Sequence, residues 1–169
     1  MSPVAASPAG AAGNAVHQAT TTSDWYLHAL LKDISVFAAK PDAETEALWK
    51  ESEHWLEEFD RLCSEARVPW ILLLIPAHVQ IDPDLQQRLL DRFALRPGDW
   101  DFDAPQRRLR TFASNRGVPI VDLLDEMRGR SRSDSLLYIP DDGHWNVLGN
   151  RIAGERLAAV IRDLRFSTR

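Results

Sequence analysis

The sequence predicts an α/β fold whose sheet contains parallel strands. Residues 70–75 form a short, continuous apolar run between Pro69 and Pro76, which is typical of a strand buried on both faces. Residues 118–122 form a second short strand of this kind. A helical segment lies between the two, and a strand, a helical crossover and another strand make a right-handed βαβ unit with parallel strands.

Two helices are expected before the first strand, because apolar residues recur there at helical spacing. The first begins at Ser23 and ends at Pro41, since proline cannot continue a helix. The second runs from about Asp42 to Ala66. Its apolar stripe, expected to face the core, consists of Leu48, Trp55, Phe59, Leu62, Cys63 and Ala66. Its opposite face, expected to be solvated, carries Glu46, Lys50, Glu53, Glu57 and Arg61.

Further helices are expected after the first strand. Asp82 followed by Pro83 is an N-cap and first-turn signal, and Asp103 with Gln106 resembles a capping box for a helix that stops at Gly117. Residues 128–134 are expected to form a loop, and residues 136–139 offer a third, weaker strand pattern. A final helix follows, with a buried stripe of Gly149, Ala153, Leu157, Val160, Ile161 and Leu164.

The length and charge of the chain limit the kinds of protein to which it can belong. The 169 residues suit one domain, expected at residues 23–169. Residues 1–22 lack Asp, Glu, Lys and Arg and are expected to form a disordered tail. This tail does not have the pattern of a secretory signal, so the cytoplasm is the default location, although a full-length parent protein could be exported. The net charge of -5 argues against nucleic-acid binding, and no apolar run is long enough for a membrane segment.

Cysteine and histidine usage gives no sign of a metal or cofactor. Cys63 is the only cysteine, so the chain cannot form an internal disulfide. The five histidines are scattered without the spacing of zinc ligands. We therefore expect neither a metal nor a cofactor.

The segment before the last helix contains a candidate catalytic pair. Ligands of parallel sheets bind beyond the carboxyl ends of the strands, and Asp141, Asp142, Gly143 and His144 are expected there. An imidazole acts as a general base when a carboxylate accepts its Nδ1 proton, and one tight turn through Gly143 could bring Asp141 to His144. The alternative is a turn and N-cap sequence in which His144 is only a first-turn residue. A metal held by the same side chains would need a further ligand that the sequence does not offer.

Residues 138–149, YIPDDGHWNVLG, resemble the last sequence block of the SGNH/GDSL hydrolase superfamily, in which an Asp-x-x-His pair belongs to a Ser-His-Asp triad. Residues 70–80 and 117–123 are similar to two further segments of these enzymes, and the resemblance extends over about residues 24–165. It implies a flavodoxin-like three-layer α/β/α sandwich with a parallel sheet. It also implies that His144 is the general base and that Asp141 orients it. Asp142 matches no essential position of the superfamily, and we expect it to cap the last helix.

The sequence departs from the superfamily at the nucleophile. No Gly-Asp-Ser occurs, and the one Gly-Asp, at Gly98 and Asp99, is followed by Trp100. The resemblance therefore covers the carboxy-terminal half of the fold, and the domain is expected to be incomplete on its N-terminal side. An apolar strand at an open edge invites association, so self-association through an exposed sheet edge is expected.

The resemblance leads to two functional hypotheses of different class. The first is an ester hydrolase acting on acyl esters of small molecules or carbohydrates, or an O-acyltransferase of the same superfamily. The second is a non-catalytic α/β remnant or interaction module, because this chain lacks a recognisable nucleophile.

Overall fold

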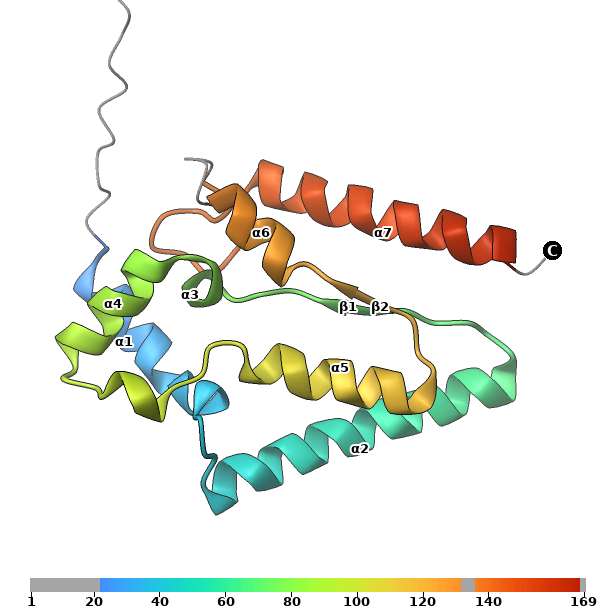
Figure 1. Cartoon of the computed structure of the whole chain (residues 1–169), viewed down its shortest axis with the longest axis horizontal. Coiled ribbons are helices and arrows are strands. Elements are labelled where there is room, and N and C mark those ends of the chain that lie inside the picture. The colour runs from blue at the N-terminus through green and yellow to red at the C-terminus, as the bar shows by residue number, and fades with distance from the viewer. Residues whose placement is uncertain (1–21, 132–135, 168–169) are drawn as a thin grey trace, which may run out of the picture.

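Residues 22–131 and 136–167 are the part of the chain that the computed structural model describes. Within it, strands β1 (Leu72–Leu74) and β2 (Ile120–Asp122) form a parallel pair in which Leu72 lies opposite Ile120. Both strands are shorter than the sequence predicts. Figure 1 shows α6 and α7 on one side of the strands and α2 and α5 on the other. The predicted α/β class is confirmed. The tail expected at residues 1–22 lies outside the described residues, apart from Thr22.

The expected first helix divides into two parts. Helix α1 (Asp24–Lys32) ends at Asp33, and a 3-10 turn, η1 (Ile34–Phe37), follows it. The tighter turn brings Ile34 and Phe37 into a hydrophobic cluster with α1 and α4, where both side chains are buried. The physical reason for the break is therefore the packing of these two residues.

Helix α2 (Ala43–Ala66) begins at Asp42, whose carboxylate accepts a hydrogen bond from the Thr45 N–H at 2.8 Å. Its orientation is the reverse of the expected one. The face that carries Glu46, Glu53 and Glu57 is turned toward α5, and the apolar stripe is largely exposed, with Trp55 63% exposed. The expectation of a buried stripe is wrong. The expectation of a solvated opposite face is wrong for Glu46, Glu53 and Glu57, whereas Lys50 and Arg61 are exposed as expected.

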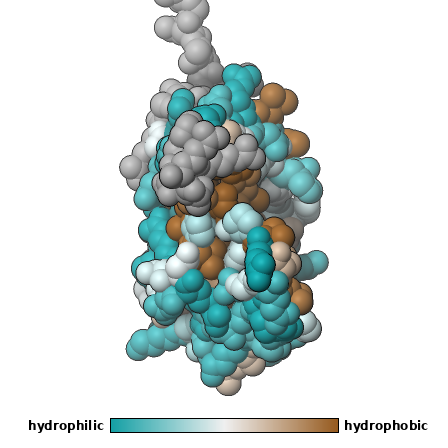
Figure 2. All heavy atoms as spheres, turned by 90° about the vertical axis from the view of Figure 1, so that its right-hand side faces the viewer, coloured by the Kyte–Doolittle hydropathy of each residue, from teal (hydrophilic) through white to brown (hydrophobic). Residues whose placement is uncertain are grey.

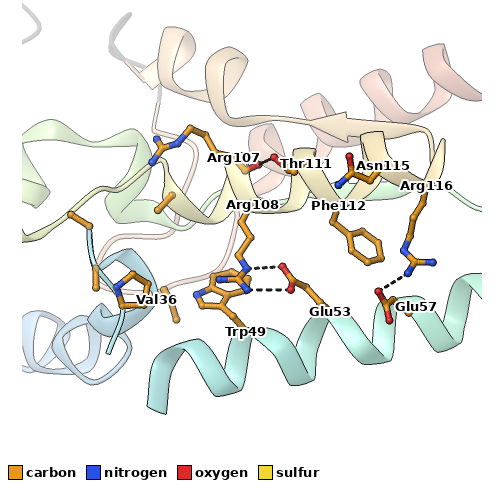
Figure 3. A pocket seen from close by; sticks show the side chains of 14 residues that line it. Val36, Trp49, Glu53, Glu57, Arg107, Arg108, Thr111, Phe112, Asn115 and Arg116 are labelled. Atoms are coloured by element: carbon orange, nitrogen blue, oxygen red, sulfur yellow. Dashed lines mark hydrogen bonds and ion pairs between the residues drawn. The ribbon is translucent and has the colours of Figure 1, made fainter. Parts of the chain in front are cut away.

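The reason lies in helix α5 (Ala104–Arg116), which directs arginines at α2. Arg108 donates hydrogen bonds to Glu46 and Glu53, and Arg116 pairs with Glu57. Figure 3 shows Arg108 pointing to Glu53 and Arg116 pointing to Glu57, beside a cavity of about 970 Å³ between the two helices. Ion pairs, rather than apolar contacts, hold the acidic face of α2 against α5.

Between the strands, α3 (His78–Ile81) and α4 (Pro83–Arg92) precede a 3-10 turn, η2 (Pro97–Asp99). Asp82 caps α4 as predicted, and its carboxylate accepts from the Leu85 N–H at 3.0 Å. The predicted capping box of α5 does not form. Asp103 instead pairs with Arg128 at 2.6 Å, and the Gln106 amide bonds to Gln80.

The last third is more helical than expected. Helix α6 (Leu124–Ser131) occupies the first part of the predicted loop, and residues 136–139 form no strand beyond a single bridge between Tyr138 and Trp145. Helix α7 (Val147–Ser167) buries Gly149 and Ala153, and Leu157 and Val160 are partly buried against the core. Leu164 is 36% exposed, so the burial of the predicted stripe decreases toward its end.

This packing of the helices leaves both hydrophilic and hydrophobic side chains at the surface. Figure 2, which looks at the end where α2 and α7 terminate, shows mostly hydrophilic atoms with hydrophobic residues reaching the surface between them. Within residues 22–131 and 136–167, no helix is both long and apolar enough to cross a bilayer.

Candidate functional site

The candidate site lies where β1 ends and residues 138–145 turn back on themselves. The Ile139 N–H donates to the His144 carbonyl at 3.0 Å, and the Asn146 N–H donates to the Leu137 carbonyl at 2.9 Å. Together with the bridge between Tyr138 and Trp145, these bonds define a hairpin-like loop. We refer to residues 138–145 as the histidine loop.

Two aromatic side chains fix the histidine loop to the end of β1. The Tyr138 hydroxyl donates to the carbonyl of Pro76, and the Trp145 indole N–H donates to the Tyr138 oxygen at 2.9 Å. Burial raises the pKa of Tyr138 to about 12. The hydroxyl therefore stays protonated and able to donate over the whole physiological range.

His144 is at the tip of this loop, and Asp142 is the carboxylate that contacts it. Asp142 Oδ1 contacts His144 Nδ1 and accepts from the His144 backbone N–H at 2.8 Å. The hydrogen bond from His144 holds the pKa of Asp142 below its ordinary value. The His144 side chain is 87% exposed, so the opposite ring nitrogen, Nε2, faces solvent-accessible space.

Asp141 points elsewhere. Its Oδ1 accepts from the Ser23 backbone N–H at 2.9 Å, at the start of α1. Asp141 is also the residue of the turn with left-handed backbone, at φ 55, a conformation that glycine adopts more readily than other residues. The structure brings Asp142, and not Asp141, to His144; the orienting role of Asp141 stays a prediction.

The cap of α7 is also made by a different residue from the expected one. Asn146 Oδ1 accepts from the N–H groups of Leu148 and Gly149 at 2.9 and 3.1 Å. Asp142 is four residues upstream of the cap and is engaged with His144 instead. Its expected role as a helix cap is wrong, because the Asn146 amide already satisfies the first turn.

His78 and Tyr26 adjoin the histidine loop, although no sequence pattern marked them as a pair. The His78 ring stacks on Tyr138 at a centroid distance of 4.8 Å, and its Nδ1 lies 3.3 Å from the Tyr26 hydroxyl. The Tyr26 hydroxyl also donates to the Asp142 carbonyl at 3.4 Å. Burial lowers the pKa of His78 and raises that of Tyr26 to about 12. The position of His78 just after β1 was the available signal.

These residues border an open pocket of about 380 Å³ beside the histidine loop. Trp25, Tyr26 and Leu30 of α1 form its apolar side, and His78 and Asp142 form its polar side. Within the described ranges, no three His, Cys, Asp or Glu side chains are placed to hold a metal ion.

A comparison with protein families identifies the fold that carries this loop. The family model of an SGNH hydrolase-like domain, acetyltransferase AlgX, matches residues 36–169, which are most of the chain. The chain belongs to this family. No curated protein and no solved structure matched it.

The match places the histidine loop inside an SGNH hydrolase-like domain and confirms the resemblance inferred from the sequence. Members of the superfamily use a serine with their histidine and carboxylate. Ser23 hydrogen-bonds to Asp141 of the histidine loop through its backbone N–H, and its hydroxyl takes no part in that bond. Its Oγ is buried and has no hydrogen-bond partner among the described residues.

Proposed function

We propose that this domain performs acyl-ester chemistry, with O-acetyl esters of carbohydrates or small molecules as substrates and His144 as its general base. The observation that carries this proposal is the contact between Asp142 and Nδ1 of an exposed His144, beside an open pocket at the carboxyl end of β1. The family membership supports the same chemistry.

The pair supports a two-step reaction. Because Asp142 accepts the Nδ1 proton, Nε2 of His144 has a free lone pair that takes the proton from an attacking hydroxyl. The hydroxyl oxygen then bonds to the ester carbonyl carbon, and the alcohol leaves with the proton that His144 returns. In the second step water or a carbohydrate hydroxyl attacks the acyl group and regenerates the first hydroxyl. Water as acceptor gives an esterase, and a sugar gives a transferase.

A non-catalytic module is the second candidate. It is favoured by the contacts of His144, because no serine, threonine or cysteine side chain among the described residues hydrogen-bonds to this imidazole. A base and its carboxylate without a nucleophile lose most of the rate.

The experiment is hydrolysis of p-nitrophenyl acetate by the purified full chain, with and without an oligosaccharide acceptor. We expect His144→Ala to reduce the rate to background and Asp142→Asn to reduce it by about 10²-fold or more, because the tautomer is no longer fixed. Asp141→Asn is the matched control with a small expected effect, since that carboxylate bonds to Ser23. Acetylated oligosaccharide among the products would identify the transferase.

Other results decide between the candidates. Equal rates for the unchanged chain and His144→Ala would establish the non-catalytic module. A loss with Asp141→Asn as large as that with Asp142→Asn would return the orienting role to Asp141. Loss of activity in Ser23→Ala, with unchanged folding by circular dichroism, would identify Ser23 as the nucleophile.

A further inference from the structure

A second pair of imidazole and carboxylate lies beside the histidine loop, and the proposed reaction does not use it. His78 is the first residue of α3, and its Nε2 lies 3.6 Å from Oδ2 of Asp82. The other oxygen of this carboxylate accepts from the Leu85 N–H at the start of α4, which fixes its direction. The two side chains are only 17% and 26% exposed. A carboxylate at 3.6 Å is too far for a hydrogen bond, but its charge favours a proton on Nε2.

With this proton on Nε2, His78 presents the lone pair of Nδ1 to Tyr26 of α1. The Tyr26 hydroxyl lies 3.3 Å from Nδ1 and 3.4 Å from the carbonyl oxygen of Asp142. A hydroxyl that shares one proton between two acceptors makes longer bonds than a hydroxyl with one acceptor. Tyr26 is 4% exposed, and burial raises its pKa to about 12, so the shared proton is present over the whole physiological range.

The same imidazole supports the second tyrosine of the site. The His78 ring stacks on Tyr138, with ring centroids 4.8 Å apart and planes 4° from parallel. Tyr138 in turn donates to the Pro76 carbonyl and accepts from Trp145. His78 therefore lies between the two tyrosines that fix the histidine loop, one on α1 and one in the loop itself.

Helix α1 holds two consecutive residues of the histidine loop. The Ser23 N–H donates to the Asp141 carboxylate at 2.9 Å, and the Tyr26 hydroxyl donates to the Asp142 carbonyl. Figure 1 shows α1 close to α3 and α4, near the end of β1. The Asp142 carboxylate in turn contacts His144. The position of this carboxylate depends on Tyr26, because a shift of the Asp142 backbone carries its side chain with it.

The charged groups around His78 come from α4 and the histidine loop. Burial is the largest influence and lowers the pKa of His78 from its ordinary value of 6.5. The carboxylates of Asp82 and Asp141 act in the opposite direction, and Arg88 of α4 lowers the pKa further. The imidazole is therefore neutral at physiological pH, so Nδ1 is free to accept the Tyr26 proton.

We propose that His78 is a positioning residue: its Nδ1 holds the Tyr26 hydroxyl at the Asp142 carbonyl, and this keeps the Asp142 carboxylate against His144. This role in acyl-ester chemistry rests on the proposed function. His78 acts through Tyr26 and the backbone of the histidine loop, and not on the ester itself.

Three substitutions separate the Nδ1 contact from the stacked ring. His78→Phe keeps a ring against Tyr138 but removes Nδ1, and Tyr26→Phe removes only the hydroxyl. His78→Asn places an amide near the position of Nδ1 and removes the ring. In hydrolysis of p-nitrophenyl acetate by the full chain, we expect both Phe variants to lower kcat by at least about 10-fold with KM nearly unchanged, because misplacing a catalytic group by 1 Å costs up to about 10²-fold. The double variant loses no more than either single one, since both break the same contact. His78→Asn recovers most of the rate.

NMR titration of the Asp142 carboxyl carbon measures the positioning without any turnover. The hydrogen bond from His144 holds the pKa of Asp142 below its ordinary value of 3.8. We expect this pKa to return to its ordinary value in His78→Phe and Tyr26→Phe and to stay low in His78→Asn. His28→Phe is the matched control, because His28 of α1 is 52% exposed and packs on Phe93. This control leaves both the rate and the titration unchanged, and circular dichroism checks that every variant is folded.

The two measurements distinguish the role of His78 from the proposed function. A full chain that does not hydrolyse the ester contradicts the proposed function, and the titration still decides whether His78 holds Asp142. An Asp142 pKa that stays low in both Phe variants overturns the positioning role, whatever the rates are. Equal losses in His78→Phe and His78→Asn, without a loss in Tyr26→Phe, assign His78 to packing alone and also overturn it. If His78→Phe does not fold, Tyr26→Phe and His78→Asn decide the outcome.

Discussion

Among single residues, Gly149 decides how closely α7 approaches the histidine loop. A Cβ atom at this position would lie 2.7 Å from the Leu137 carbonyl oxygen and 3.1 Å from Trp145 Cβ. Both neighbours are held in place, since the Leu137 carbonyl accepts from Asn146 and Trp145 bonds to Tyr138. The loop can lie on the first turn of α7 because this residue has no side chain.

We therefore expect Gly149→Ala to lower the free energy of unfolding by about 1–3 kcal/mol, the usual cost of forcing an extra carbon into a packed region. Gly154→Ala is the control in the same helix, because a Cβ there meets nothing within 4 Å. Alanine at an open helical position raises stability by about 0.5–1 kcal/mol. Urea unfolding measures both, and equal shifts for the two variants would contradict the close-packed loop.

The sequence predicted the histidine and a neighbouring carboxylate, but it could not decide which carboxylate. Asp141 and Asp142 are both within reach of His144 along the chain, and the choice depends on which residue of the turn adopts left-handed backbone. Glycine is the usual residue for that conformation, yet Asp141 adopts it here and turns its side chain to Ser23. The hydrogen bond between Ser23 and Asp141 is a long-range contact, so it cannot be inferred from the spacing of residues along the turn.

At the level of elements, the α2–α5 contact depends on Arg108. Its side chain is 25% exposed and donates to two carboxylates that are themselves 36% and 26% exposed. The guanidinium also lies over the Trp49 ring at 5.3 Å. The hydrogen bonds to Glu46 and Glu53 raise the pKa of Arg108, so the charge is permanent.

We expect Arg108→Ala to lower the free energy of unfolding by about 1–3 kcal/mol, because it leaves two half-buried carboxylates without their partner. Arg107→Ala removes the neighbouring arginine, which is 57% exposed and pairs with Asp101 at the surface. Such a pair contributes less than about 1 kcal/mol. Thermal or urea unfolding compares the two, and a loss for Arg107→Ala equal to that for Arg108→Ala would show that burial of the pair does not matter.

Helical periodicity predicted that α2 has one apolar and one acidic face, and the structure has both. It could not predict which face turns inward, because that depends on arginines of α5 that are 55 to 62 residues away from their partners in the sequence. Arginines at Arg108 and Arg116 attract the acidic face. The cap at Asp82 was predicted from the sequence because its hydrogen bond is local.

For the whole molecule, the two tyrosines join parts that are far apart in the sequence. Tyr26 of α1 contacts His78 and Asp142, and Tyr138 connects the histidine loop to the end of β1. Burial is the largest cause of the raised pKa of both, with the carboxylates of Asp142 and Asp141 adding to it at Tyr26.

Because the chain has only these two tyrosines, its phenolate absorbance reports on both. In the folded state we expect ionisation near pH 12, above the ordinary value of 10. Between these values the unfolded chain binds fewer protons, so stability is complete below pH 10 and falls as the pH rises toward 12. Absorbance at 295 nm measures the titration. Phenolate formation near pH 10 without unfolding would contradict the burial of these side chains.

The overall architecture was predictable to the level of its layers. The βαβ unit around β1 and β2 and the final helix follow from patterns within short segments, and the structure confirms the parallel pairing. Helix α6 was missed in part because its sequence contains Gly129 and several arginines, which favour a loop when packing is unknown, while Leu124 and Met127 are fully buried.

The bond between Ser23 and Asp141 joins residues 118 positions apart. Closing so long a span costs chain entropy that only the assembled core can offset. We therefore expect the contact between α1 and the turn of Asp142 and His144 to form late in folding, after the core that brings the two segments together.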